Sequence, residues 1–161
     1  MRHAKSSWDS PALRDLDRPL NHRGQRDAPF MGKLLKSRGL IPDRIVCSPA
    51  VRAGMTARLL ADAVGYELAA IETYPELYEQ GVSGLMTVIH GLNSGWTRVY
   101  LIGHNPDLSL LVNRLTGEHL GQLPTCGVAS LVFDVEHWPH IMEASGRLSL
   151  FDYPKRYSRD T

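Results

Sequence analysis

Residues 96–117 read WTRVYLIGHNPDLSLLVNRLTG, a short apolar run followed by a turn and a longer segment. The run at 99–102 is typical of a buried strand. Apolar residues then recur at positions 108, 111, 112 and 115, the three- and four-residue spacing of one helix face. Between them, Asn105-Pro106 fits a polar helix cap followed by proline in the first turn. The segment therefore predicts a strand, a tight turn and a helix.

A second stretch of the same kind lies upstream, where residues 43–66 read DRIVCSPAVRAGMTARLLADAVGY. The apolar run Ile45–Cys47 predicts a strand, and Ser48-Pro49 repeats the pattern of a polar cap followed by proline. The helix after it is expected to end near Gly65, because glycine commonly terminates helices. Two strand–turn–helix units predict an α/β fold with helices packed on a sheet.

The rest of the chain supplies further elements around these units. Asn21 precedes an amphipathic segment that stops at Gly39, so a helix is expected there, although Pro29 should disturb its early turns. Another helix is expected within residues 81–95, and the alternating stretches VASLVFDV and RLSLFDY predict a hairpin. Residues 1–18 are polar and predict a long loop, and long loops in compact domains are often functional.

Composition and charge limit the classes of function. The chain has 161 residues, 43% of them hydrophobic, which is enough for one domain over residues 1–161. Eighteen Lys and Arg against seventeen Asp and Glu leave a formal charge of +1, which does not favour nucleic acid or an anionic membrane as partner. No apolar run approaches the ~18 residues of a membrane helix. With only Cys47 and Cys126, both in apolar settings, we expect reduced thiols in a soluble, cytoplasmic protein.

Unusual side chains follow both predicted strands. In open α/β sheets, ligands bind beyond the carboxyl ends of the strands, where backbone N–H groups and helix dipoles favour anions. Arg52 follows the first strand, and His104 lies in the turn after the second. Arg2 and His3 join them if the N-terminus lies alongside. Guanidinium groups bind tetrahedral oxyanions through paired hydrogen bonds, so this set predicts a phosphoryl site. No glycine-rich P-loop in the sequence indicates a nucleotide instead.

Five blocks of sequence, in this order, carry a resemblance to a known family: RHAKSSW, DRPLN.RG, CSPAVRA..TA, LIGHNP and LPTCGVASL. They resemble the histidine phosphatase superfamily, and in particular its small SixA-like phosphohistidine phosphatase branch. The resemblance extends from Arg2 to about Phe133. It implies a three-layer α/β/α fold of the phosphoglycerate mutase-like type, with a central, mostly parallel sheet. It also implies catalysis without a metal or another cofactor.

The resemblance assigns roles to individual residues. His3 is the implied nucleophile that takes up the phosphoryl group, while Arg2, Arg52 and His104 surround that group. An attacking imidazole must be neutral, and a backbone carbonyl that accepts from Nδ1–H would leave Nε2 free to attack. The fixed donors around the phosphoryl oxygens would then stabilise their charge in the transition state.

A second group of residues is expected to border the phosphate. Asn21 is a candidate contact to it. Arg18 and Arg23, in the same block of sequence, are expected to position the adjoining loop, and Thr125 is expected near the site.

The general acid is expected to be a carboxylate. Other branches of the superfamily use one after the second strand–helix unit, where PELYEQG offers Glu76 and Glu79. The LYE triplet makes Glu79 the better match. A phosphohistidine substrate needs less help from an acid, because its leaving imidazole has a pKa of roughly 6.5 and departs more easily than an alkoxide.

The N-terminus departs from the family pattern. The family runs a central parallel strand directly into the Arg-His pair, whereas this sequence begins one residue before Arg2. A missing strand would leave backbone groups of its neighbours unpaired. We therefore expect that the polypeptide extends upstream. Otherwise another segment or a partner chain must fill the strand position, and His3 would be poorly held.

The sequence is compatible with three functions. The first is a phosphatase that acts on phosphohistidine in a protein, such as a histidine-containing phosphotransfer domain. The second is a small-molecule phosphomonoesterase, and the third is a non-catalytic phosphate-binding module, against which the retention of both His3 and His104 argues. A metal site is not expected, because His137 and His140 have no Cys or carboxylate cluster beside them. The oligomeric state is left open.

Overall fold

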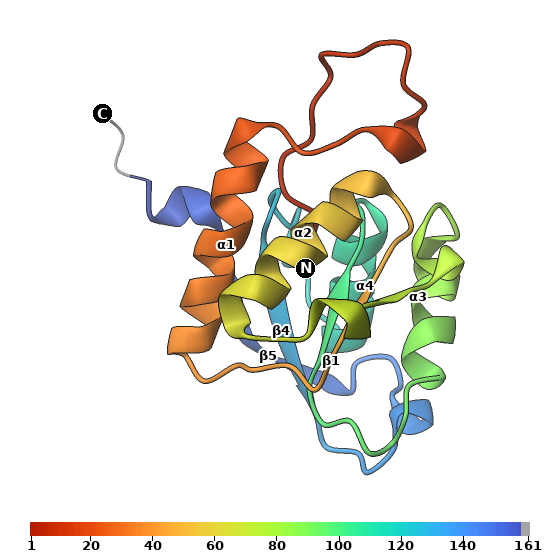
Figure 1. Cartoon of the computed structure of the whole chain (residues 1–161). Coiled ribbons are helices and arrows are strands. Elements are labelled where there is room, and N and C mark those ends of the chain that lie inside the picture. Colours follow the sequence, from red (N-terminus) through yellow and green to blue (C-terminus); the bar gives the residue numbers. More distant parts are fainter. Residues whose placement is uncertain (159–161) are drawn as a thin grey trace.

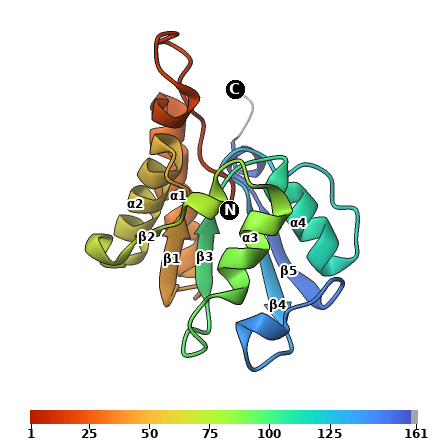
Figure 2. The same cartoon turned by 90° about the vertical axis from the view of Figure 1, so that its right-hand side faces the viewer.

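The computed structural model describes residues 1–158, whose helices and strands form three layers (Figure 1). The helices are α1 (His22–Ser37), α2 (Val51–Val64), α3 (Gly81–His90) and α4 (Asp107–Thr116). The strands are β1 (Arg44–Cys47), β2 (Glu72–Thr73), β3 (Val99–Ile102), β4 (Val128–Phe133) and β5 (Gly146–Asp152). Short 3-10 turns lie at Asp15–Asp17, Leu68–Ala70, Pro75–Leu77, Trp138–His140 and Pro154–Arg156. Helices α1 and α2 cover one face of the strands, and α3 and α4 cover the other (Figure 2). The predicted three-layer α/β/α fold is confirmed.

Strands β2, β1 and β3 form a parallel sheet in that order. Register places Cys47 of β1 opposite Ile102 of β3, so both strands end at the same edge. Strands β4 and β5 form the predicted antiparallel hairpin, with an irregularity between Ser130 and Leu131. Because the turns after β1 and β3 leave the same edge, Arg52 and His104 are brought together there.

The first residues of the chain lie between β3 and β4 (Figure 2). Arg2 forms a parallel bridge with Gly103, and the His3 N–H donates to the Gly103 carbonyl at 3.0 Å. On the other side, the Arg2 N–H donates to the Gly127 carbonyl at 3.0 Å. Arg2 and His3 therefore occupy the end of the central strand position between β3 and β4. The expectation that His3 would be poorly held is wrong, because backbone pairing on both sides fixes it; the upstream extension stays a prediction.

Helix α1 begins as predicted but tolerates its proline. The Asn21 side chain accepts from the Gly24 N–H at 2.9 Å and caps the helix. Pro29 lies within the helix, which continues to Ser37 without interruption, so the expected disturbance is not found. Only one backbone hydrogen bond is lost at a proline, and burial of the Met31 face against α2 offsets that loss.

The two predicted caps of α2 and α4 are wrong. The structure places Ala50 and Pro106 in the cap positions, and neither helix has a side-chain cap. Ser48 instead lies in the turn, where its Oγ accepts from the Ala50 N–H at 3.1 Å. Asn105 donates from Nδ2 to the Leu123 carbonyl at 2.9 Å and so braces the neighbouring loop. Both turns are longer than predicted, which leaves their polar side chains available at the strand ends.

The core lies on both sides of the parallel sheet. Ile45, Leu60 and Ile102 belong to a buried cluster under α1 and α2, whereas Val46 and Leu115 belong to one under α3 and α4. Neighbouring residues of β1 thus point to opposite clusters, which explains its uninterrupted apolar sequence. Among the helices of residues 1–158, none has the length and hydropathy needed to cross a bilayer.

Candidate active site

A cavity of about 690 Å³ opens at the carboxyl ends of β1 and β3. The predicted residues Arg2, His3, Arg52, Glu79 and His104 all line it. The remaining lining residues are Lys5, Ser6, Trp8, Asp15, Arg18, Tyr78, Gly81, Asn105, Pro106, Asp107 and Thr125. Five segments that are distant in sequence therefore meet at the predicted edge of the sheet.

His3 has one ring nitrogen fixed and the other free for chemistry. Its Nδ1 lies 2.7 Å from the carbonyl oxygen of Ala4. A carbonyl can only accept, so Nδ1 carries the proton and Nε2 carries the lone pair. Burial lowers the pKa of His3 to about 3, so the ring is neutral at pH 7. The expected tautomer is therefore supported by this contact.

The backbone around His3 is held by a buried threonine. Thr56 Oγ1 accepts from the Ala4 N–H at 3.0 Å and donates to the Arg52 carbonyl at 2.7 Å. The Thr56 side chain is fully buried, so neither bond competes with water. One hydroxyl of α2 thus links the residue after the candidate nucleophile to the helix that carries Arg52.

His104 adopts the opposite tautomer. Its Nδ1 lies 3.4 Å from Arg52 Nη2, which can only donate, so this nitrogen is the acceptor. Its Nε2 therefore carries the proton and donates to Ser48 Oγ at 2.7 Å. Burial and the neighbouring Arg52 charge lower the pKa of His104 to about 4, so this ring is also neutral at pH 7.

Three guanidinium groups line the same cavity as the two imidazoles. Arg52 donates from Nε toward His3 Nε2 at 3.4 Å. Arg2 donates from Nη1 to the Leu123 carbonyl at 3.1 Å, while its Nε is buried without a hydrogen-bond partner in the described part of the chain. Arg18 lies over the ring of Trp8, 3.6 Å from its centroid. Such a concentration of fixed donors suits a phosphoryl group.

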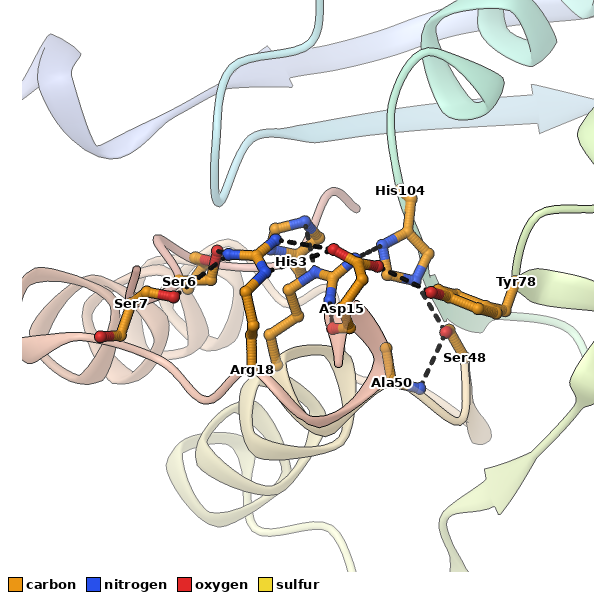
Figure 3. Close-up of polar contacts among 11 residues, drawn as sticks. His3, Ser6, Ser7, Asp15, Arg18, Ser48, Ala50, Tyr78 and His104 are labelled. Atoms are coloured by element: carbon orange, nitrogen blue, oxygen red, sulfur yellow. Dashed lines mark hydrogen bonds and ion pairs between the residues drawn. The ribbon is translucent and has the colours of Figure 1, made fainter. Parts of the chain in front are cut away.

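Asp15 and Tyr78 complete the cavity (Figure 3). The Asp15 carboxylate pairs with Arg52 and accepts from the Tyr78 hydroxyl at 2.7 Å. These bonds, with Tyr78 and then Arg52 and Arg18 as donors, lower the pKa of Asp15 to about 2. Burial and the Asp15 carboxylate raise the pKa of Tyr78 to about 12, so its hydroxyl remains a donor.

Comparison with known proteins connects this geometry to a family. Residues 1–90 match the model of the histidine phosphatase superfamily (branch 1). The chain belongs to the histidine phosphatase superfamily. It is 32% identical to the phosphohistidine phosphatase SixA of Escherichia coli over 83% of each chain. It is also 30% identical to a chloroplastic protein of Arabidopsis thaliana, over 91% of this chain and 70% of that one.

Solved structures agree with the assignment. The structure of the protein histidine phosphatase SixA complexed with tungstate aligns with a TM-score of 0.84 and 26% identity. The alignment covers 98% of this chain and 97% of that one. The phosphoglycerate mutase-like fold predicted for this histidine phosphatase is thereby confirmed, and membership of the superfamily supports phosphatase activity.

The other predicted residues of this histidine phosphatase differ in their placement. Glu79 is exposed at the cavity and has a φ of 56°, whereas Glu76 is not among the lining residues. Thr125 lines the cavity as expected. Asn21 does not line it, because its side chain caps α1, and Arg23 pairs with Asp27 at 3.4 Å. The structure thus gives Asn21 and Arg23 roles in and around α1.

Asp15, Tyr78 and Ser48 were not predicted from the sequence as site residues. Tyr78 belongs to the LYE triplet that pointed to Glu79, and Ser48 was interpreted as a cap. Asp15 lay in a segment interpreted only as a polar loop. The one available signal was that long polar loops are often functional.

The histidine pair considered as a metal site lies outside the cavity of the histidine phosphatase. The rings of His137 and His140 lie 5.5 Å apart, centroid to centroid. Within residues 1–158, no three His, Cys, Asp or Glu side chains are grouped so that they could hold a metal ion.

Proposed function

We propose that this protein is a phosphatase that hydrolyses phosphohistidine through a covalent phosphohistidine intermediate on His3. The observation that carries the proposal is the state of His3. Its Nδ1–H is held by the Ala4 carbonyl, so the lone pair of Nε2 is available beside the donor edge of Arg52. A nucleophile that is neutral, oriented and adjacent to fixed cationic donors is suited to phosphoryl transfer.

The reaction has two steps. In the first, the Nε2 lone pair of His3 forms a bond to phosphorus, while the bond from phosphorus to the substrate nitrogen breaks. The substrate imidazole, protonated by solvent on its other ring nitrogen, leaves as a neutral ring with that electron pair. In the second step, water attacks phosphorus, His3 Nε2 recovers its electron pair and inorganic phosphate leaves. Arg2, Arg52 and His104 would stabilise the charge on the transferring oxygens.

Glu79 is the proposed general acid for poorer leaving groups. It is an exposed carboxylate at the cavity, and Asp15 is too acidic for the role because its pKa is lowered to about 2. An imidazole leaves without strong acid help, whereas an alkoxide does not. In Glu79→Gln, phosphohistidine hydrolysis should be nearly intact and hydrolysis of alkyl phosphates abolished. Equal losses on both substrates would exclude the assignment.

The proposed substrate is a phosphorylated protein, such as a histidine-containing phosphotransfer domain. The similarity to proteins named phosphohistidine phosphatase and to a SixA structure with tungstate supports an oxyanion substrate of this kind. A small phosphomonoester is the alternative, because a cavity of about 690 Å³ falls within the range of small-molecule sites. The proposal includes a single domain and a cytoplasmic location, which the two buried, unpaired thiols support.

The test is to trap the intermediate. Protein is mixed with a ³²P-phosphohistidine phosphotransfer domain, quenched in alkali and examined for label on wild type, His3→Ala and His119→Ala. Label on wild type and on His119→Ala, an exposed histidine outside the cavity, with release of phosphate, would support the covalent phosphatase. Labelling of His3→Ala would assign the nucleophile elsewhere. Release of phosphate only from small esters would favour the alternative.

A further inference from the structure

The Arg52 guanidinium has two hydrogen-bonding edges, and Asp15 occupies the outer one. Its Nη1 donates to the Asp15 carbonyl at 2.6 Å and its Nη2 donates to Asp15 Oδ2 at 2.9 Å. A guanidinium presents its N–H groups as a rigid planar fork, so two bonds at one end fix the whole plane. The Arg52 side chain is only 6% exposed, which leaves it little freedom to turn away.

The other edge of the same guanidinium points at the two histidines. Arg52 Nε lies 3.4 Å from His3 Nε2, and Nη2 lies 3.4 Å from His104 Nδ1. Both contacts are longer than the about 2.8 Å of a strong charge-assisted hydrogen bond. A phosphoryl oxygen between the rings could therefore accept shorter hydrogen bonds from Arg52 Nε and Nη2. Nη2 belongs to both edges but carries two N–H groups, so one can bind Asp15 while the other faces His104.

Asp15, which binds the outer edge of Arg52, is itself held by residues from several segments (Figure 3). Tyr78, from the loop before α3, donates to Asp15 Oδ2 at 2.7 Å. Arg18 donates to Asp15 Oδ1 from both Nε and Nη2 at 3.2 Å. Arg18 in turn donates to Ser6 Oγ at 2.7 Å, close behind the candidate nucleophile in sequence. A carboxylate with donors on both oxygens cannot rotate freely, so its position relative to Arg52 is set.

We propose that Asp15 is a positioning residue, which fixes the outer end of Arg52 so that the inner Nε–Nη2 edge is presented to a phosphoryl group at His3. The inference rests on the proposed function, because it assigns Arg52 to the transferring group. Asp15 acts only through Arg52. Its carboxylate also adds negative charge beside the phosphate site, so its removal should not weaken ground-state binding of an anion.

We expect the loss of Asp15 to change kcat and KM differently. In Asp15→Ala, Arg52 keeps its charge but loses its orientation, so kcat should fall about 10-fold or more while KM does not rise. Binding of inorganic phosphate, measured by calorimetry, should be as tight as in wild type or tighter. Asp15→Asn keeps one acceptor oxygen for Arg52 and should recover part of kcat. A purely structural role would raise KM, weaken phosphate binding and lower the melting temperature instead.

Asp17→Asn is the matched control. Asp17 lies on the same 3-10 turn, and its carboxylate pairs with Arg14 at 2.8 Å, a side chain that is 77% exposed. This variant removes one carboxylate from the same segment without touching Arg52. It should behave as wild type in kcat, KM and phosphate binding.

The decisive experiment is a double-mutant cycle on hydrolysis of the ³²P-phosphohistidine phosphotransfer domain. If Asp15 acts through Arg52, adding Asp15→Ala to Arg52→Lys should cost less than about 2-fold, because lysine has no fork to orient. The inference would be overturned, with the proposed function left standing, if the kcat loss of the double variant equalled the product of the two single losses. Wild-type kcat in Asp15→Ala would have the same consequence. Wild-type kcat in Arg52→Lys and Arg52→Ala would overturn the proposed function together with it.

Discussion

The rings of His3 and His104 lie 5.1 Å apart, centroid to centroid, and Arg52 donates toward one nitrogen of each. Each ring is held by a different partner: His3 donates from Nδ1 to the Ala4 carbonyl, and His104 donates from Nε2 to the Ser48 hydroxyl. They therefore share one guanidinium while holding their protons on different nitrogens. Burial is the main cause of the lowered pKa of both rings, and a cationic ring at either position would also face the Arg52 charge.

The first prediction concerns these tautomers. At pH 5, His3 should be neutral with its proton on Nδ1, and His104 neutral with its proton on Nε2, because the two pKa values are lowered to about 3 and about 4. Long-range ¹H–¹⁵N spectra of the imidazole rings distinguish these forms. His3→Ala and His104→Ala assign the signals. A cationic pattern for either ring at pH 5 would contradict the expectation.

The second prediction concerns stability and pH. In the unfolded chain an imidazole takes up a proton near pH 6.5, whereas in the fold His3 and His104 do so only near pH 3 and 4. Below pH 6.5 the unfolded state therefore binds more protons, and the free energy of unfolding falls as the pH is lowered toward those values. Urea unfolding at pH 7, 6 and 5 measures the slope. His3→Ala should give a shallower slope, and an unchanged slope would contradict the account.

The third prediction concerns the hydroxyl beneath the site. Thr56→Val keeps the shape of the buried side chain but leaves the Ala4 N–H without its acceptor, which should cost about 1–3 kcal/mol of stability. It should also lower kcat, because Ala4 holds the His3 ring. Thr87→Val is the control, since Thr87 makes the same bond to the carbonyl four residues back but on an exposed helix surface. Equal effects of the two variants on urea unfolding would show that the Ala4 bond contributes nothing.

The fourth prediction concerns a glycine of α1. A Cβ at Gly24 would lie 2.2 Å from the carbonyl oxygen of Lys5, a backbone atom two residues after His3. Gly24→Ala must therefore displace α1 or the segment that carries His3, and it should reduce both stability and kcat. Gly54→Ala is the matched helical control, because nothing lies within 4 Å of its added carbon. Since alanine favours helix over glycine, Gly54→Ala should stabilise the protein by up to about 1 kcal/mol in urea unfolding. A stable, fully active Gly24→Ala would show that the close contact relaxes without consequence.

Much of the fold follows from local sequence. Strand β3 begins and ends at the predicted residues, α1 begins directly after Asn21 as predicted, and Gly65 ends α2 in the left-handed conformation. These features depend on neighbours a few residues away, because apolar periodicity, capping side chains and glycine act over one or two turns. The edge at which Arg52 and His104 meet also followed, since the turns after parallel strands share one side of a sheet.

The partners of polar side chains were decided only by the tertiary structure. Asp15 lies 37 residues from Arg52 and 63 from Tyr78, and nothing in its local sequence distinguishes it from Asp17. Ser48 was expected to cap a helix but instead binds His104, 56 residues away. The sequence by itself determined the four helices, strands β1 and β3, the hairpin and the candidate nucleophile. The folded chain decided which loop carboxylate holds the arginine, because hydrogen bonds between loops depend on how whole elements pack.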